Sequence, residues 1–200
     1  AADPQSATVA ARVKNSSLRM ARMVEQLLNL ARLQGGRLPL QPRSIELATL
    51  CRSVIDEFTS RENGKRIVFA SRGNTAGAWD TDLVWQAVSN LVSNALHHGA
   101  EGGDVSVEVD GEAADCVRLK VANRGVIPAE VFPHLFKAFG PNNSGSRSRE
   151  GLGLGLHIVQ EIARMHGGGV SVKSDEADGT VFTIELPRMV TLQRGSFSGK

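Results

Sequence analysis

Two stretches of this sequence combine residue types that suit phosphate and metal binding. The first is Gly151-Leu152-Gly153-Leu154-Gly155-Leu156, in which three glycines alternate where a polar loop gives way to a helical pattern. Glycines at a helix start let backbone N–H groups approach an anion, and the helix dipole adds a favourable potential for phosphate. A helix whose glycines only permit close packing on a sheet would show the same pattern. No strand pattern directly precedes the run and no Gly-x-x-x-x-Gly-Lys-Ser/Thr is present, so neither a dinucleotide fold nor a P-loop is indicated.

The second stretch is a stripe of neutral amides, Asn90 and Asn94, one helical turn apart and continued by His97. Their side-chain carbonyls can offer oxygen ligands to a hard cation such as Mg²⁺ without adding negative charge beside phosphates. A solvated polar helix face is the alternative. His97 and His98 are adjacent and point to different sides of a helix, so a zinc site is not expected.

A helix over Thr81 to His98, with Asp80 or Thr81 as its N-cap, is predicted to position these amides. Its apolar residues repeat at steps of three and four, which indicates a buried face. They are Leu83, Val84, Ala87, Val88, Leu91, Val92, Ala95 and Leu96. The polar residues of the other side are Gln86, Asn90, Ser93, Asn94 and His97. The helix therefore turns an uncharged polar stripe away from the core.

The elements around this helix are predicted from hydrophobic periodicity and from turn residues. Helices are expected at 47–58, at 128–136 opened by Pro128, and at 154–166 ended by Gly167 and Gly168, and strands at 66–71, 105–109, 117–121, 169–173 and 180–186, with a hairpin turn near Gly111 and a loop at 140–150. This order implies an α+β fold: a two-layer α/β sandwich whose helices cover one face of a mixed, mostly antiparallel sheet.

A long helix is predicted to precede this sandwich, from about residue 8 to residue 33. Its apolar seam, with Leu28 and Leu30 beside it, is wider than one small neighbouring domain would cover, so the helix is expected to pair with other helices. Gly35-Gly36 ends it, and Pro39 and Pro42 mark a linker. The expected organisation is a partial helical region at 1–38, a linker at 39–44, the sandwich at 45–188 and a tail at 189–200.

Composition excludes several classes of protein. Hydrophobic residues make up 41% and charged residues 22%, which is typical of soluble globular chains, and the net charge of +2 does not suggest a partner of nucleic acid. Cys51 and Cys116 form no CxxC pair, so a reducing, cytoplasmic environment is expected. No apolar stretch reaches the length of a membrane helix, so no membrane contact is expected of this chain.

Four motifs then follow one another in a recognisable order. They are Asn90-Leu91-Val92-Ser93-Asn94-Ala95-Leu96-His97-His98-Gly99, Asn123-Arg124-Gly125-Val126-Ile127-Pro128, Phe136-Lys137-Ala138-Phe139 and Gly151-Leu152-Gly153-Leu154-Gly155. The succession resembles the N, G1, F and G2 boxes of the ATP-binding catalytic domain of two-component sensor histidine kinases, over roughly residues 45–188. The resemblance implies the histidine kinase/gyrase/Hsp90-type ATP-binding fold, with ATP and Mg²⁺ as cofactors.

Carried over residue by residue, the resemblance assigns Asn94 as the Mg²⁺ ligand and Asn90 to a place beside the phosphates. Asn123 stands where the family has an Asp that accepts a hydrogen bond from the adenine amino group. The full set of ATP-binding residues implied is Asn90, Asn94, His97, His98, Asn123, Gly125, Ile127, Phe136, Phe139, Arg147, Gly151, Leu152, Gly153, Leu154, Gly155, Leu156 and Thr180. The G1 box departs from the usual Asp-x-Gly-x-Gly-Ile-Pro, since it lacks the second glycine and one residue of length.

The segment 18–33 resembles the second helix of the family's dimerisation and phosphotransfer domain, which implies a homodimer through the N-terminal helix. The first histidine of the chain is His97, and nothing upstream matches the family's phosphoacceptor pattern. The chain is therefore expected to be part of a longer kinase that carries the phosphoacceptor histidine elsewhere. A response regulator receiver domain is the partner that the resemblance implies.

The leading interpretation is a kinase domain that transfers the γ-phosphoryl of ATP to a histidine outside this chain, for two-component signal transduction. The first alternative is a non-catalytic module that serves dimerisation or docking of a response regulator. The second is a gyrase-like or chaperone-like ATPase, which would need a carboxylate base to activate water. The superfamily places that Glu where this chain has Asn90, so hydrolysis is disfavoured.

Overall fold

The computed structural model describes residue 9 and residues 40–59, 66–100, 102–139 and 153–189. They fall into two compact units. The larger unit holds the described residues of 39–129 and those from Val159 onward, and the smaller unit holds residue 9 and the described residues of 130–158. The predicted helix 8–33, apart from Val9, the loop 140–150, and the tail after Met189 lie outside the described residues.

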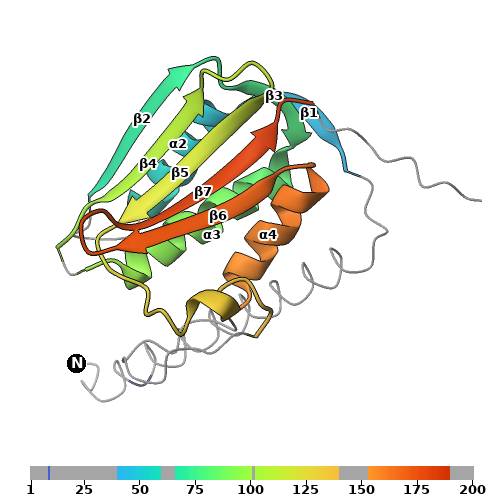
Figure 1. The fold of residues 1–200 in the computed structure, drawn as a ribbon. Coiled ribbons are helices and arrows are strands. Elements are labelled where there is room, and N and C mark those ends of the chain that lie inside the picture. Colours follow the sequence, from blue (N-terminus) through green and yellow to red (C-terminus); the bar gives the residue numbers. More distant parts are fainter. Residues whose placement is uncertain (1–8, 10–39, 60–65, 101, 140–152, 190–200) are drawn as a thin grey trace, which may run out of the picture. The chain divides into compact units, whose positions relative to one another are not determined.

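The larger unit is built on a five-stranded sheet with the strand order β2-β4-β5-β7-β6 (Figure 1). The strands are β2 (Ile67–Gly73), β4 (Val105–Gly111), β5 (Cys116–Asn123), β7 (Gly179–Pro187) and β6 (Gly169–Asp175). Only β2 and β4 are parallel; the other neighbours pair antiparallel. The predicted mixed, mostly antiparallel sheet and its β4–β5 hairpin are confirmed.

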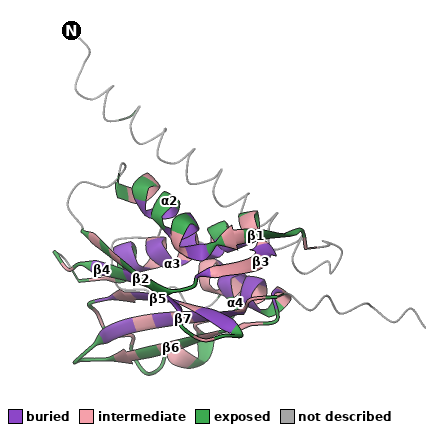
Figure 2. Cartoon of the chain, turned by 90° about the horizontal axis from the view of Figure 1, so that it is seen from above, coloured by how far each residue is buried: buried purple, intermediate pink, exposed green. Residues whose placement is uncertain are grey.

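Helices α2 (Leu47–Thr59) and α3 (Thr81–His98) lie on one face of this sheet (Figure 1). Buried residues line the helix sides that face the sheet, while most residues on the sheet's other face are half-buried or exposed (Figure 2). The burial follows the sequence periods: Val105, Val107 and Val109 are all buried along β4, with the polar Ser106 exposed between them. The two-layer sandwich is therefore confirmed.

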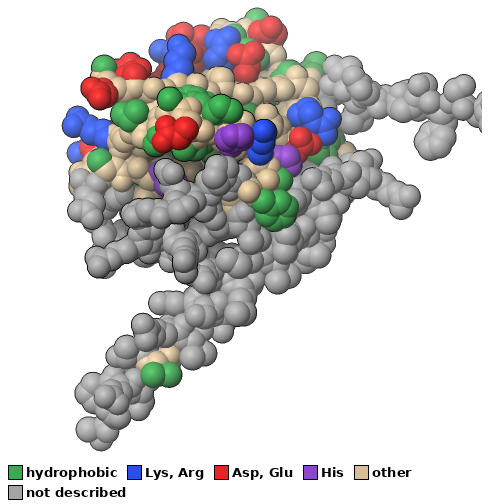
Figure 3. Space-filling model, turned by 60° about the horizontal axis from the view of Figure 1, so that its bottom comes forward, with side chains coloured by type: hydrophobic (Ala, Val, Ile, Leu, Met, Phe, Trp, Pro, Cys, Tyr) green, Lys and Arg blue, Asp and Glu red, His purple; other side chains and the backbone are tan. Residues whose placement is uncertain are grey.

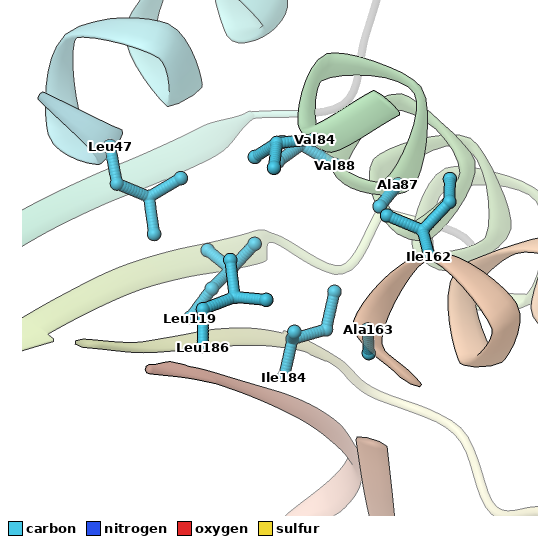
Figure 4. Close-up of a pocket in the computed structure, with 9 residues that line it drawn as sticks. All are labelled: Leu47, Val84, Ala87, Val88, Leu119, Ile162, Ala163, Ile184 and Leu186. Carbon is cyan, nitrogen blue, oxygen red and sulfur yellow. The ribbon is translucent and has the colours of Figure 1, made fainter. Parts of the chain in front are cut away.

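The centre of the core contains a small apolar cavity where both helices meet the sheet (Figure 4). It is lined by Leu47 of α2, Val84, Ala87 and Val88 of α3, Leu119 of β5, Ile184 and Leu186 of β7, and Ile162 and Ala163 of α4 (Gly155–Met165). All nine side chains are aliphatic, so nothing in this cavity could hold a charged or polar ligand. It is a packing gap of the core.

A second, two-stranded sheet was missed by the periodicity. Strand β1 (Pro42–Glu46) pairs antiparallel with β3 (Ala76–Asp80), and β1 begins within the predicted linker. The fully buried Trp79 donates from Nε1 to the Pro187 carbonyl over 2.6 Å. Asp80 then caps α3, because its Oδ1 accepts from Leu83 N at 3.3 Å, as predicted. The small sheet thus sets where α3 begins.

Two helix boundaries differ from their predictions. Pro128 does not open a helix: the only helical turn there is the 3-10 helix η1 (Phe132–His134), in which Pro133 occupies the first turn. The helical turn starts at Phe132, four residues later than expected, and the fixed φ of Pro133 favours its first turn. Helix α4 begins at Gly155 and ends at Met165, one residue inside the predicted range at each end.

Among the described helices, none is both long and apolar enough to cross a membrane.

Candidate functional site

The polar stripe of α3 lies where the sequence predicted it. Leu91, Val92 and Ala95 are buried, while Asn90 and Asn94 are half-buried on the other side of the helix. The Asn94 side chain makes no hydrogen bond to any described residue, so its carbonyl oxygen can accept a ligand. The exposed His97 donates from Nδ1 to the Ser93 carbonyl of its own helix at 2.9 Å.

The C-terminal end of α3 lies against the end of β5 because Gly99 has no side chain. A Cβ at Gly99 would meet the Ala95 carbonyl oxygen at 2.6 Å and the Asn123 Cβ at 3.3 Å. The next residue, Ala100, donates its N–H to the Arg124 carbonyl. These contacts bring the polar stripe and Asn123, two separate sequence motifs, to the same end of the sheet.

Asn123 is the last residue of β5 and is only 5% exposed. Its Nδ2 donates to the Arg124 carbonyl oxygen at 3.4 Å. This contact sets the orientation of the amide, because the flipped amide would place Oδ1 against that carbonyl oxygen. Asn123 therefore presents Oδ1 as an acceptor, which matches a 6-amino purine such as adenine.

The G1 segment continues from Asn123 through a glycine in an unusual conformation. Gly125 has φ of 145°, a region that residues with a side chain rarely adopt, and the following Val126 is 52% exposed. The buried Thr180 donates its hydroxyl to the Gly125 carbonyl at 2.7 Å. Ile127 N donates to the Ser174 hydroxyl at 2.9 Å. Side chains of β6 and β7 thus hold the segment after Asn123.

Charge is mixed around these elements. Figure 3 shows Lys and Arg side chains interspersed with Asp and Glu on the described part of the face in view. The pKa of the fully buried His166 is lowered, chiefly because burial disfavours its charged form, although its hydrogen bond to Ile162 and the nearby Asp80 act in the opposite direction. The stripe of α3 itself carries amides, a hydroxyl and one histidine, and the carboxylate on this helix face is that of the exposed Asp82 in the first turn, at the far end of the helix from His97.

The smaller unit contains the described part of the glycine run. Gly153 has φ of 67°, and α4 begins two residues later at Gly155. The N–H groups of a first helical turn have no partner within the helix, which suits this end of α4 to an anion. Leu154 is fully buried and its carbonyl accepts from Ile158 N at 2.9 Å. The Leu154 side chain packs in the interior, whereas glycines have no side chain that would keep a ligand away from the backbone.

The described F box also belongs to the smaller unit. The Phe136 carbonyl accepts from Nδ1 of His157 at 2.9 Å, and the exposed Phe139 has φ of 57°. His157 was not among the predicted site residues, and only its place directly after the glycine run could have drawn attention to it. Its contact ties the F box to the first turn of α4.

The predicted site residues divide as follows. The larger unit holds Asn90, Asn94, His97, His98, Asn123, Gly125, Ile127 and Thr180; the smaller unit holds Phe136, Phe139, Gly153, Leu154, Gly155 and Leu156; and Arg147, Gly151 and Leu152 lie outside the described residues. Ser174 was missed, because a serine on a strand of alternating pattern has no signal that points to a site.

The five-stranded sheet with helices on one face can be compared with known proteins. The family described as "Histidine kinase-, DNA gyrase B-, and HSP90-like ATPase" matches residues 79–190. The match covers more than half of the chain, which therefore belongs to this family. It begins at β3 and extends past β7, so it takes in α3, the G1 segment, the F box and the glycine run.

Sensor kinases are among the similar proteins. Sensor protein SrrB of Staphylococcus aureus is 29% identical over 88% of this chain and 31% of its own length, so the chain spans about a third of these curated relatives. The catalytic domain of histidine kinase ThkA is 27% identical, with a TM-score of 0.64 over 74% of this chain and 97% of that one. Full-length ShkA in complex with AMPPNP is 27% identical, with a TM-score of 0.75 over 94% of this chain and 39% of that one.

Proposed function

We propose that this chain is the ATP-binding catalytic part of a sensor histidine kinase and binds Mg·ATP. The observation that carries the proposal is the convergence of the α3 amide stripe and the Asn123 acceptor at one end of the sheet, through the Gly99 contact. The likeness to ShkA, solved with AMPPNP, supports it. In the whole protein, the γ-phosphoryl group would pass to a histidine outside this chain.

Each residue then has a role that its chemistry allows. Asn123 Oδ1 accepts from the adenine amino group, and Asn94 offers its carbonyl oxygen to Mg²⁺. On the family pattern, Asn90 and His97 are assigned to the phosphates, and the backbone of the glycine run around Gly153 and Gly155 is assigned to phosphate oxygens as well. The residues fit the metal, since a neutral amide oxygen suits a hard cation that already shares phosphate oxygens. When bound, Mg²⁺ would neutralise charge that develops on those oxygens.

Positioning is the catalytic contribution of these residues, since none of them need form a covalent bond to phosphorus. Arg147, Gly151 and Leu152 are assigned to the phosphates, and Phe136 and Phe139 to the adjoining F box, on the family pattern alone. Position 90 carries an amide rather than a carboxylate, which disfavours a water-activating ATPase. A homodimer through the N-terminal helix, a response regulator receiver domain as partner and a cytoplasmic location complete the proposal.

The non-catalytic docking module remains the competing function, because Asn123 and the shortened G1 box depart from the family pattern. Calorimetric titration with AMPPNP, with and without Mg²⁺, separates the two. We expect Mg²⁺-dependent binding by the chain. Asn94→Ala should weaken it at least tenfold, the equivalent of about 1.4 kcal/mol.

The matched control is Gln160→Ala, which truncates an exposed amide on α4. It should bind AMPPNP as the unmodified chain does. A folded chain that binds no AMPPNP would support the docking module. Equal Mg²⁺-dependent affinity in the Asn94→Ala variant would remove Asn94 from the metal site.

A further inference from the structure

Three hydrogen bonds connect the G1 segment with β7 and with the edge strand β6, which lies beside it. Ile127 N lies 2.9 Å from Ser174 Oγ, Ser174 Oγ lies 2.8 Å from Thr180 Oγ1, and Thr180 Oγ1 lies 2.7 Å from the Gly125 carbonyl oxygen. The strand register explains the proximity, because Asn123 of β5 pairs with Thr180 of β7, which pairs in turn with Ser174 of β6. The three side chains therefore form one row across the sheet.

The direction of every hydrogen bond in this row is determined. Ile127 N can only donate and the Gly125 carbonyl can only accept. Each hydroxyl has a single proton, and the proton of Thr180 is given to Gly125. The middle contact must therefore be donated by Ser174. The order from Ile127 N–H to Ser174, to Thr180 and to the Gly125 carbonyl is named the hydroxyl relay below.

Apart from the hydrogen bond that Ala100 N donates to the Arg124 carbonyl, the segment after Asn123 is held by the hydroxyl relay. The G1 box is one residue short, Gly125 has a backbone conformation open mainly to glycine, and Val126 is exposed. Arg124 lies between Asn123 and Gly125, and its carbonyl is the group that orients the Asn123 amide. Ala100 N anchors that carbonyl from the α3 side, and the backbone of Gly125, which the relay holds, fixes it from the other side. The relay therefore acts, through Gly125 and Arg124, on the base-facing atom of Asn123.

We propose that Ser174 and Thr180 are positioning residues that determine base selectivity, a proposal that rests on the nucleotide site proposed above. An aspartate offers only acceptors to a base, whereas an amide can present its acceptor to a 6-amino purine or, once flipped, its donor to a 6-oxo purine. The relay keeps the Arg124 carbonyl where it forbids the flip. With the relay intact the site prefers an adenine nucleotide, and with the relay broken it discriminates poorly against guanine.

The test uses Thr180→Val, which keeps the branched shape but removes the hydroxyl, Ser174→Ala, and the double variant. Thr180→Ser is the conservative variant that retains the donor. Matched controls on the same strands are Thr183→Val and Ser171→Ala, which lie outside the relay. Calorimetry with AMPPNP and with GMPPNP, both with Mg²⁺, gives the selectivity ratio. Amide hydrogen exchange at Gly125 and Ile127 reports on the segment itself.

We expect each single variant to lower the AMPPNP-to-GMPPNP affinity ratio about tenfold, since one hydrogen bond contributes up to about 1.5 kcal/mol. Amide hydrogen exchange at Ile127 should be faster in both single variants than in the unmodified chain. The double variant should show the same affinity ratio as either single variant, because the loss of one hydroxyl already interrupts the relay. Thr180→Ser and both controls should keep the original ratio.

An unchanged ratio in Thr180→Val and Ser174→Ala, or the same loss in the two controls, would overturn the proposal. If the unmodified chain binds neither nucleotide, the proposed function fails, and the exchange measurement still decides whether the relay holds the segment. Unchanged exchange at Ile127 in both single variants would then reject the relay by itself.

Discussion

The two ends of the five-stranded sheet are stabilised by different kinds of hydrogen bond. At one end the guanidinium of Arg188 donates to several backbone carbonyls, whereas at the other end neutral hydroxyl and amide side chains bond to the backbone. Arg188 donates to the carbonyls of Asn74, Ala76, Gly111 and Ala113 over 2.7 to 3.3 Å. Its own backbone bonds to Asp115 and Ala78. This arrangement, the Arg188 end, closes the turns that follow β2 and β4.

The opposite end, the Asn123 end, contains the hydroxyl relay and the α3 stripe. A charged donor with five N–H groups satisfies many carbonyls at once and leaves little for a ligand. Small neutral side chains also hydrogen-bond the nearby backbone, but each uses few of its groups to do so. Acceptors such as the Asn94 carbonyl oxygen and Asn123 Oδ1 then remain for a ligand. The comparison teaches that the two ends of one sheet are built differently: the Arg188 end is tied together by hydrogen bonds to backbone carbonyls, and the Asn123 end keeps the acceptors that the proposed nucleotide site requires.

The largest expected effect comes from breaking the Arg188 end. Arg188→Ala leaves several carbonyls without a donor, so the free energy of unfolding should fall by about 3 kcal/mol. Arg188→Lys should recover little, because an ammonium lacks the planar fork. Urea denaturation measures the loss. AMPPNP affinity of the folded fraction should stay within about twofold, and a large loss of affinity at unchanged stability would show that the two ends are not separate.

The next largest effect is expected from two glycines, one at each end of the sheet. A Cβ at Gly111 would meet the Asn74 carbonyl oxygen at 1.9 Å, and a Cβ at Gly179, which has φ of 76°, would meet the Asn123 carbonyl oxygen at 2.4 Å. Either change to alanine should cost about 2 kcal/mol of stability. Only Gly179→Ala should also weaken AMPPNP binding, because it displaces Asn123. Equal affinities in the two variants would contradict this division.

The smallest effect is a pH dependence at His166, which lies near the Arg188 end. Its Nδ1 donates to the Ile162 carbonyl at 2.7 Å, so its neutral Nε2 accepts from Asp80 N at 3.1 Å. Burial lowers the pKa of His166 below the usual 6.5, while the nearby Asp80 carboxylate raises it. The unfolded chain therefore binds a proton more readily, so the free energy of unfolding is highest above about pH 6.5 and falls as the pH drops below it.

Urea denaturation between pH 7.5 and pH 5 measures this fall, and His166→Gln should flatten it. The contribution of Asp110 belongs to a separate window, because the Arg72 hydrogen bond lowers the pKa of that carboxyl to about 2 and its stabilisation is lost only as the pH falls from about 4 towards 2. A decline that persists unchanged in His166→Gln would show that another group is responsible.

Much of the fold could be predicted, because the spacing of apolar residues along the sequence shows which face of a helix or strand is buried. The α3 stripe, the β4–β5 hairpin and the helix that follows the glycine run all have strong local patterns. β1 and β3 were missed because each is short: Pro42 opens one, and Gly77 interrupts the other. Pro128 was wrongly taken as a helix start, since local preference could not choose between it and Pro133.

The sequence by itself determined which residue types lie on which faces: a neutral stripe on α3, glycines before α4 and an amide at the end of β5. Only the tertiary structure decided which groups bond to them. Ser174 reaches Ile127, Arg188 reaches Asn74, and His166 reaches Asp80, each across 47 or more residues of chain. These contacts depend on strand order and register, which bring distant segments side by side, and local periodicity contains no information about either.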